Sequence, residues 1–251
     1  MPVDEFRPIG NLKPLNKFIK YEHFKMEGLD SVRFLLKKGD YMITLDLKDT
    51  YFVVGIHSSL RKLVRFQWRG RIYEFFCMAF GLAPAPLVFT KILKVVVAFL
   101  RKLGIRLVIY LDDLLFLNSS KEGVLSDFIL ARDLLEKLVF VINWKKSVVT
   151  PAQIMEYLGL LIGSVRMSFA LPQYKVEAVL LMCRNALSAG TVSLRCIASI
   201  LGNFNWTIPT IPFAQSHYRS MQRFYIESRK VRGNLNERRV LSTETRADLT
   251  L

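Results

Sequence analysis

Alternation of hydrophobic and polar residues predicts one strand early in the chain and marks an anomaly further along. In the stretch YMITLDL (41–47) every second residue is apolar, so one face of this strand is expected to be buried, while the other carries Asp46. The apolar run IRLVIYLDDLLFLN (105–118) is interrupted by two adjacent acidic residues, Asp112 and Asp113. Burying two neighbouring carboxylates without compensation costs more than short strands return. These two residues therefore need an explanation.

Apolar residues spaced three and four apart predict two helices, over 86–103 and 121–138. Gly104 is expected to end the first helix, because glycine is favoured just past a helix C-terminus. Ser119 and Glu122 have the spacing of a capping box at the start of the second.

The central part of the chain therefore follows the order β-α-β-β-α-β, with strands at 41–47, 105–110, 114–118 and 140–144. This order is typical of a split βαβ sheet. Right-handed crossovers make the first two strands parallel and place the third between them. The end of the first strand and the turn after the second then lie at one end of the sheet. Asp46, Asp112 and Asp113 are thus expected to meet in space.

Shorter patterns predict elements on both sides of this α+β core. Two β-rich runs around an Arg-Gly turn (63–76) predict a hairpin, and the runs within 155–171 predict another. Beyond Pro172 the spacing becomes helical, with one helix ending at Gly190 and the next starting at Ser193 as its N-cap.

Composition narrows the class of partner. The chain has 251 residues, 51% of them hydrophobic, which is enough for one large domain or two small ones. Its net charge of +15 is spread along the sequence, which favours nucleic acid over an acidic membrane surface as a partner. No apolar run reaches the roughly 18–20 residues that span a bilayer, and the first residues lack a signal-peptide pattern. With three widely spaced cysteines, we expect an intracellular protein of the cytoplasm or nucleus, without a membrane partner.

Three carboxylates at one sheet edge of a basic protein need a cation between them. Oxygen ligands favour Mg²⁺ or Mn²⁺, and two such ions about 3.5–4 Å apart can activate an attacking oxygen and stabilise a leaving one. An Asp-Asp pair is also an ordinary turn signal, so the dipeptide alone leaves both interpretations open. The strand pattern, the sheet order and the charge favour the metal site.

Six stretches resemble the motifs of reverse transcriptases and follow the order of that family over about residues 5–165. They are RPIGNLKPLNKFI (7–19), TLDLKDTYFVVGI (44–56), CMAFGLAPAPLVFTK (77–91), YLDDLL (110–115), VINWKKS (141–147) and EYLGLLI (156–162). The wording of NLKPLNKFI, EHFKMEGLDSV and LDLKDTYF is most similar to retrotransposons that integrate with a tyrosine recombinase, the DIRS group. The stretch 192–223 is similar to their thumb and connection region.

The resemblance implies a right-hand polymerase fold with a split palm sheet, small fingers and a partly helical thumb and connection. Fingers and palm would occupy 1–165, and the primer-grip exit, thumb and truncated connection 166–251. The implied activity is RNA-directed DNA polymerisation: dNTPs are added to a primer 3′-hydroxyl on an RNA or DNA template by two-metal phosphoryl transfer. The chain would belong to a retrotransposon polyprotein that also carries ribonuclease H and recombinase parts.

Two other functions compete with this interpretation. A catalytically decayed palm-fold remnant that binds nucleic acid is the main alternative. A metal-dependent nuclease is a poorer one, because the nucleotide-binding stretches would then have no task. Several positions depart from the family pattern, namely Thr50, Ala79, Leu87 and Val139, and no ribonuclease H carboxylate set is found. We interpret the chain as a fragment or a decaying genomic copy with its carboxylates intact.

The resemblance also assigns roles to single residues. Asp46 and Asp112 would be the main ligands of two Mg²⁺ ions, or of Mn²⁺, with Asp113 as a supporting carboxylate. The other expected contacts are Arg7 on the triphosphate, Tyr51 as the ring that excludes a 2′-hydroxyl, Phe80 and Gly81 under the nucleotide, Lys146 or Lys145 at the leaving pyrophosphate, Tyr110 and Leu111 near primer and nucleotide, and Tyr157, Leu158 and Gly159 at the primer end. Core packing or a solvated surface is the alternative interpretation for the aromatic and basic positions.

Overall fold

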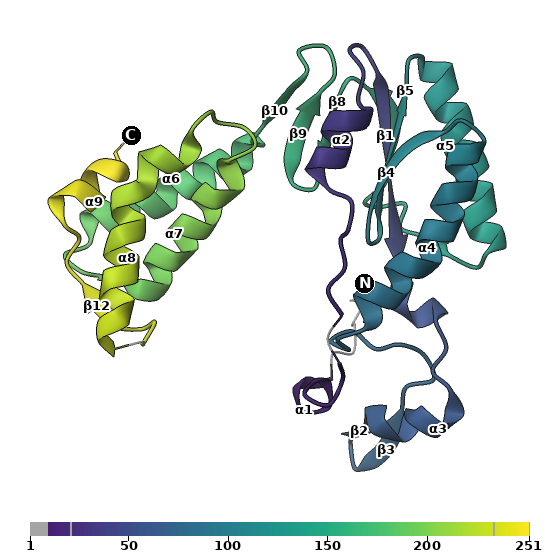
Figure 1. Cartoon of the computed structure of the whole chain (residues 1–251), viewed down its shortest axis with the longest axis horizontal. Coiled ribbons are helices and arrows are strands. Elements are labelled where there is room, and N and C mark those ends of the chain that lie inside the picture. The colour runs from purple at the N-terminus through teal and green to yellow at the C-terminus, as the bar shows by residue number, and fades with distance from the viewer. Residues whose placement is uncertain (1–9, 21, 233, 251) are drawn as a thin grey trace. The chain divides into compact units, whose positions relative to one another are not determined.

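The computed structural model describes residues 10–20, 22–232 and 234–250 of the chain (Figure 1). The chain forms two compact units. Unit 1 comprises Met1–Leu158 and Ser164–Arg166, and unit 2 comprises Gly159–Gly163 and Met167–Leu251. The division into fingers and palm over 1–165 and thumb and connection over 166–251 stays a prediction.

A five-stranded sheet lies at the centre of unit 1, in the order β4-β5-β1-β6, with β7 also paired to β1. The strands are β1 (Tyr41–Lys48), β4 (Arg106–Tyr110), β5 (Asp113–Asn118), β6 (Val141–Ile142) and β7 (Val148–Ala152). β5 is antiparallel to both β1 and β4, so β1 and β4 run parallel on either side of it. The predicted split βαβ arrangement is confirmed.

Two helices, α4 (Ala85–Lys102) and α5 (Lys121–Lys137), cover one face of this sheet (Figure 1). The alternation in β1 explains why: its apolar face forms one buried cluster with side chains of both helices. Gly104, at φ +87°, follows the end of α4 as predicted. The predicted cap of α5 was wrong by one residue. The helix starts at Lys121, and the hydroxyl of Ser120, rather than that of Ser119, accepts the Gly123 N–H.

Unit 1 also contains several shorter helices and strands. They are α1 (Lys13–Asn16), α2 (Leu29–Leu35), η1 (Thr50–Val53), α3 (Ser58–Arg61), η2 (Lys62–Val64), β2 (Arg65–Trp68), β3 (Arg71–Glu74) and β8 (Ile154–Tyr157). β2 and β3 pair around the predicted Arg-Gly turn. β6 is shorter than the predicted 140–144, because the chain turns at Asn143.

A turn inside the run 155–163 divides it into two short strands. Leu158 and Gly159 both have positive φ, +48° and +75°, and they separate β8 from β9 (Leu160–Gly163). β9 then pairs with β10 (Ser168–Ala170), so the second half of the predicted hairpin is confirmed. Glycine at position 159 favours such a turn, because it adopts positive φ without strain, whereas leucine rarely does.

Unit 2 is mainly helical around its own buried cluster. In addition to β9 and β10 it contains α6 (Gln173–Ser188), β11 (Val192–Ser193), α7 (Leu194–Thr207), η3 (Ala214–Tyr218), α8 (Arg219–Arg232), β12 (Arg238–Arg239) and α9 (Thr243–Asp248). The Ser193 hydroxyl accepts the Cys196 N–H, which confirms the predicted N-cap. α6 ends two residues before the predicted Gly190. Across the described ranges, no helix combines the length and apolarity needed to cross a membrane.

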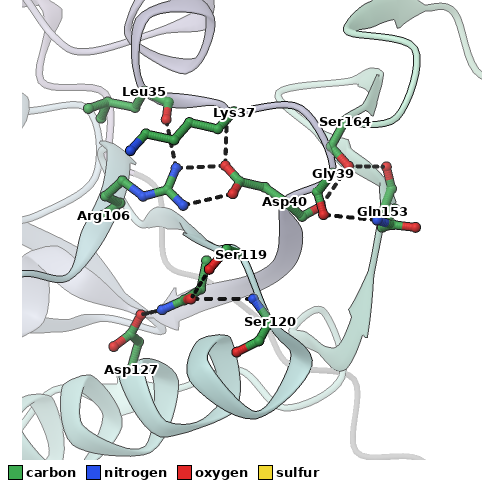
Figure 2. Close-up of polar contacts among 11 residues, drawn as sticks. Leu35, Lys37, Gly39, Asp40, Arg106, Ser119, Ser120, Asp127, Gln153 and Ser164 are labelled. Atoms are coloured by element: carbon green, nitrogen blue, oxygen red, sulfur yellow. Dashed lines mark hydrogen bonds and ion pairs between the residues drawn. The ribbon is translucent and has the colours of Figure 1, made fainter.

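A buried ion pair stands at the start of β1 (Figure 2). Asp40 is 1% exposed, and both of its carboxylate oxygens accept hydrogen bonds from the guanidinium of Arg106 on β4, at 2.6 and 2.7 Å. The Lys37 N–H donates to the same carboxylate at 2.7 Å, and Arg106 also donates to the Leu35 carbonyl at 2.9 Å. The Ser164 hydroxyl donates to the Asp40 carbonyl at 2.6 Å. These bonds fasten the end of α2 to the sheet.

Candidate active site

The three acidic residues identified in the sequence come together at one end of the central sheet. Asp46 and Asp113 are direct partners across β1 and β5, so their side chains leave the sheet on the same face. Asp112 lies in the turn between β4 and β5, and its carbonyl accepts the Leu47 N–H at 2.9 Å. The register of the sheet confirms that the three residues meet. The roles of these residues in metal binding stay predictions.

Asp113 shows the electrostatic cost of this arrangement. Its pKa is raised to about 7, first by partial burial and then by the negative charges of Asp112 and Asp46. A hydrogen bond between the Asp113 and Asp46 carboxyl groups acts in the same direction, and the positive charge of Lys146 opposes it. The three carboxylates therefore repel one another, and the ammonium of Lys146 opposes this effect only in part. A divalent cation would relieve this repulsion.

The chemistry of the donors fits a hard divalent cation, because all three side chains offer only oxygen. Among the residues that the structure describes, no group of three or more His, Cys, Asp or Glu side chains is already arranged to hold a metal ion. Metal binding by these carboxylates therefore remains a proposal.

The loop that follows β6 is fastened to the backbone of Asp46. The Asn143 N–H donates to the Asp46 carbonyl at 2.8 Å, and the Asp46 N–H donates to the Ser147 hydroxyl oxygen at 3.0 Å. Lys146 lies inside this loop. Of the two adjacent lysines, it is the one whose charge lowers the pKa of Asp113. The fold thus brings an ammonium group to the acidic site from a distant part of the sequence.

Tyr51, in η1, lies between the hydrophobic core and the acidic residues. Its ring packs against Phe80 and Phe89, with centroid distances of 4.9 and 5.8 Å. Its pKa is raised, mainly by burial and then by Asp112 and Tyr110. These ring contacts agree with the alternative interpretation, in which Tyr51 is a core aromatic residue. The phenol group is also close enough to the acidic residues for the charge of Asp112 to raise its pKa.

Gly81 follows Phe80 in a loop that α1 holds in place. Its φ of +92° favours glycine, since other residues are strained there. Asn16 of α1 donates from Nδ2 to the Gly81 carbonyl at 2.8 Å and accepts the Ala83 N–H on Oδ1 at 2.9 Å. Asn16 was not predicted as a contact of this loop. Its position inside the stretch NLKPLNKFI was the only signal.

The remaining predicted residues have different outcomes. Arg7 lies outside the described residues. Tyr157 is buried, and its hydroxyl donates to the Asp113 carbonyl at 3.1 Å. These contacts agree with the alternative interpretation, in which Tyr157 packs inside the protein. Its pKa is raised, chiefly by burial. Within unit 2, the Gly159 carbonyl accepts a hydrogen bond from Lys175 Nζ at 2.7 Å.

Fold and site together define a polymerase palm, an antiparallel sheet backed by two helices with acidic residues on adjacent strands. Residues 2–162 match the family described as reverse transcriptase (RNA-dependent DNA polymerase), and the chain belongs to this family. The resemblance seen in the sequence is thereby confirmed at the level of the family.

The relatives are polyproteins of viruses and transposons. The chain is 27% identical over 156 residues to the enzymatic polyprotein of Cestrum yellow leaf curling virus, covering 61% of this chain and 24% of that protein. It is 24% identical over 216 residues to the genome polyprotein of Petunia vein clearing virus, covering 85% and 9%. The Tf2-3 transposon polyprotein of Schizosaccharomyces pombe is 22% identical over 132 residues, covering 53% and 10%. The chain thus spans a quarter or less of each of these relatives.

Solved structures agree on the fold. The foamy viral protease-reverse transcriptase dRH in complex with ds DNA superposes with a TM-score of 0.76 at 18% identity, over 100% of this chain and 41% of that chain. The foamy viral enzyme in complex with an RNA/DNA hybrid gives 0.72 at 19% identity, over 95% and 30%. The predicted α+β polymerase fold is confirmed.

Proposed function

We propose that this chain is an RNA-directed DNA polymerase that adds dNTPs to a primer 3′-hydroxyl. The observation that carries the proposal is the cross-strand pair of Asp46 and Asp113 beside Asp112, in a chain of the reverse transcriptase family. Several like charges placed together on a sheet lower the stability of the fold, and a function in cation binding accounts for such a cluster.

The carboxylates of Asp46 and Asp112, supported by Asp113, would hold two Mg²⁺ ions, or Mn²⁺. When bound, the ions would activate the attacking 3′-hydroxyl and stabilise the leaving oxygen. Asp113 would give up the proton that its raised pKa retains near neutrality. Lys146 would stabilise the charge of the departing pyrophosphate or supply its proton.

The nucleotide would lie between the acidic site and the loop that Asn16 holds. Gly81 would allow the backbone to approach the base, and Phe80 would support it from below. Tyr51 would exclude a 2′-hydroxyl by steric contact, since its ring is fixed by two aromatic neighbours. Tyr110 would lie close to primer and nucleotide, and Arg7 would bind the triphosphate.

The partner would be an RNA or DNA template with its primer. The net charge of +15 suits backbone contacts, which are independent of sequence and sensitive to salt. The foamy viral enzyme of the same fold was solved with DNA and with an RNA/DNA hybrid, which supports this choice. Origin in a DIRS-group element, with ribonuclease H and recombinase parts in the full-length protein, rests on the wording of the sequence. Free Cys77, Cys183 and Cys196 support an intracellular compartment.

Purified protein on an oligo-dT/poly-rA primer–template, with Mg²⁺ or Mn²⁺, tests the proposal directly. We expect dTTP incorporation that requires the divalent ion. Failure in both metals, with salt-sensitive binding of the primer–template retained, would contradict the proposal and favour the non-catalytic remnant.

A further inference from the structure

One serine hydroxyl completes the hydrogen bonding of the strand that carries Asp46. Along one edge, β1 pairs with β7 at Met42 and Thr44 and with β6 at Leu47 and Lys48. Asp46 lies between these two ladders. There its N–H donates to the Ser147 hydroxyl oxygen at 3.0 Å rather than to a strand carbonyl.

The same hydroxyl closes the turn that contains Lys146. It donates to the Asn143 carbonyl at 2.9 Å, and the Asn143 N–H donates to the Asp46 carbonyl at 2.8 Å. The N–H groups of Lys146 and Ser147 also donate to the Asn143 carbonyl, at 3.1 and 3.0 Å. The turn is thus joined to both backbone groups of Asp46, and the hydroxyl provides one of these two attachments.

We propose that Ser147 is a positioning residue, whose hydroxyl holds the Asn143–Ser147 turn on Asp46 and so presents Lys146 to the acidic site. Its catalytic consequence rests on the proposed function, whereas the anchoring of the turn can be tested separately. A lysine side chain is long and flexible, so the place of its ammonium depends on how firmly its backbone is held. Misplacing a group by about 1 Å can cost up to about 100-fold in rate.

Amide hydrogen exchange at Asp46, followed by NMR, tests the anchoring without any activity. We expect exchange at least about 10-fold faster in Ser147→Ala, which removes the acceptor, and near-native exchange in Ser147→Thr, which keeps a hydroxyl. Ser188→Ala is the matched control, because that hydroxyl donates to the Arg184 carbonyl within α6, in the other unit of the chain. Unchanged protection of the Asp46 amide in Ser147→Ala would overturn the inference.

Primer extension tests the consequence for catalysis. We expect Ser147→Ala to lower kcat about 10-fold, to leave the KM for dTTP within about two-fold, and to be rescued by threonine. In a Lys146→Ala background the same change is expected to cost less than about two-fold, because the two residues act through one turn. An equal loss in both backgrounds, or no rescue by threonine, contradicts a positioning role.

The two tests separate the inference from the proposed function. If wild-type protein incorporates no dTTP with either metal, the proposed function fails and the amide exchange decides the inference. If it does incorporate dTTP while the Asp46 amide stays protected in Ser147→Ala, the inference fails and the proposed function stands.

Discussion

The acidic residues at the two ends of β1 have opposite surroundings: an arginine at one end and other carboxylates at the other. Just before the strand, Asp40 is almost fully buried, and Arg106 meets both of its carboxylate oxygens. Near the end of the strand, Asp46 meets Asp112 and Asp113 instead, and the pKa of Asp113 rises to about 7. The first cluster carries its own counter-charge and holds the fold together. In the second, the like charges of Asp112 and Asp46 raise the pKa of Asp113 in spite of Lys146, which is the property expected of a site that binds cations from outside.

The contrast is also one of energy. Removing one partner of a buried ion pair leaves an uncompensated charge, which commonly costs about 3–5 kcal/mol of stability. Removing one of several like charges relieves repulsion instead. Equivalent aspartate-to-asparagine changes at the two ends of the strand should therefore have opposite consequences for stability and for activity.

The largest effect is expected from Asp112→Asn. Because an amide cannot replace the charge of a carboxylate on a metal ion, incorporation of dTTP should fall by at least about 1,000-fold, which corresponds to about 4 kcal/mol in the barrier. Steady-state primer extension measures the loss, and urea unfolding should show no comparable loss of stability. Asp127→Asn is a suitable control, since Asp127 accepts a hydrogen bond from Asn118 away from the acidic site. Equal extension by Asp112→Asn and wild type would refute the metal role.

A smaller effect, on stability rather than on activity, is expected from Asp40→Asn. The change leaves Arg106 without its partner, so the free energy of unfolding should fall by about 3 kcal/mol. Urea denaturation measures it. Below the unfolding transition, primer extension should stay within a few-fold of wild type. A stability loss under about 0.5 kcal/mol would mean that the Asp40–Arg106 pair contributes little to stability, as an exposed ion pair does, and would contradict this prediction.

The smallest effect is expected from Asp113→Asn in metal-free protein. The raised pKa means that the folded state keeps a proton which the unfolded state has released, between about pH 4 and about 7. Stability from this group is therefore lost as the pH rises through that window. The asparagine variant escapes this loss, so its advantage over wild type should grow by about 1 kcal/mol from pH 5 to pH 8, after allowance for partial solvent screening. Urea unfolding in EDTA at the two pH values measures the change, and an advantage independent of pH would contradict it.

The sequence was sufficient for the parts of the fold that have a long, regular pattern. β1, α4 and α5 follow their apolar spacing, and the handedness of crossovers then orders the sheet and brings Asp46 to Asp113. The strand β7 was not predicted. Pro151 lies within it and weakens the strand pattern.

The candidate site could be located from the sequence, but not its supporting contacts. Asp40 and Arg106 are 66 residues apart, and Asp46 and Ser147 are 101 apart. Periodicity reports only which face of an element is buried, so it cannot indicate such partners. The choice between Lys145 and Lys146 likewise depended on how the turn after β6 lies on β1.

Binding of Mn²⁺ by the three aspartates can be measured without turnover, so it tests the proposed metal site independently of activity. Wild type and Asp112→Asn would be titrated with Mn²⁺ by electron paramagnetic resonance, in the presence of primer–template and a non-hydrolysable dTTP analogue. We predict that wild type binds Mn²⁺ at this site and that Asp112→Asn loses this binding, whereas Asp40→Asn retains it. Identical Mn²⁺ binding by wild type and Asp112→Asn would contradict the account.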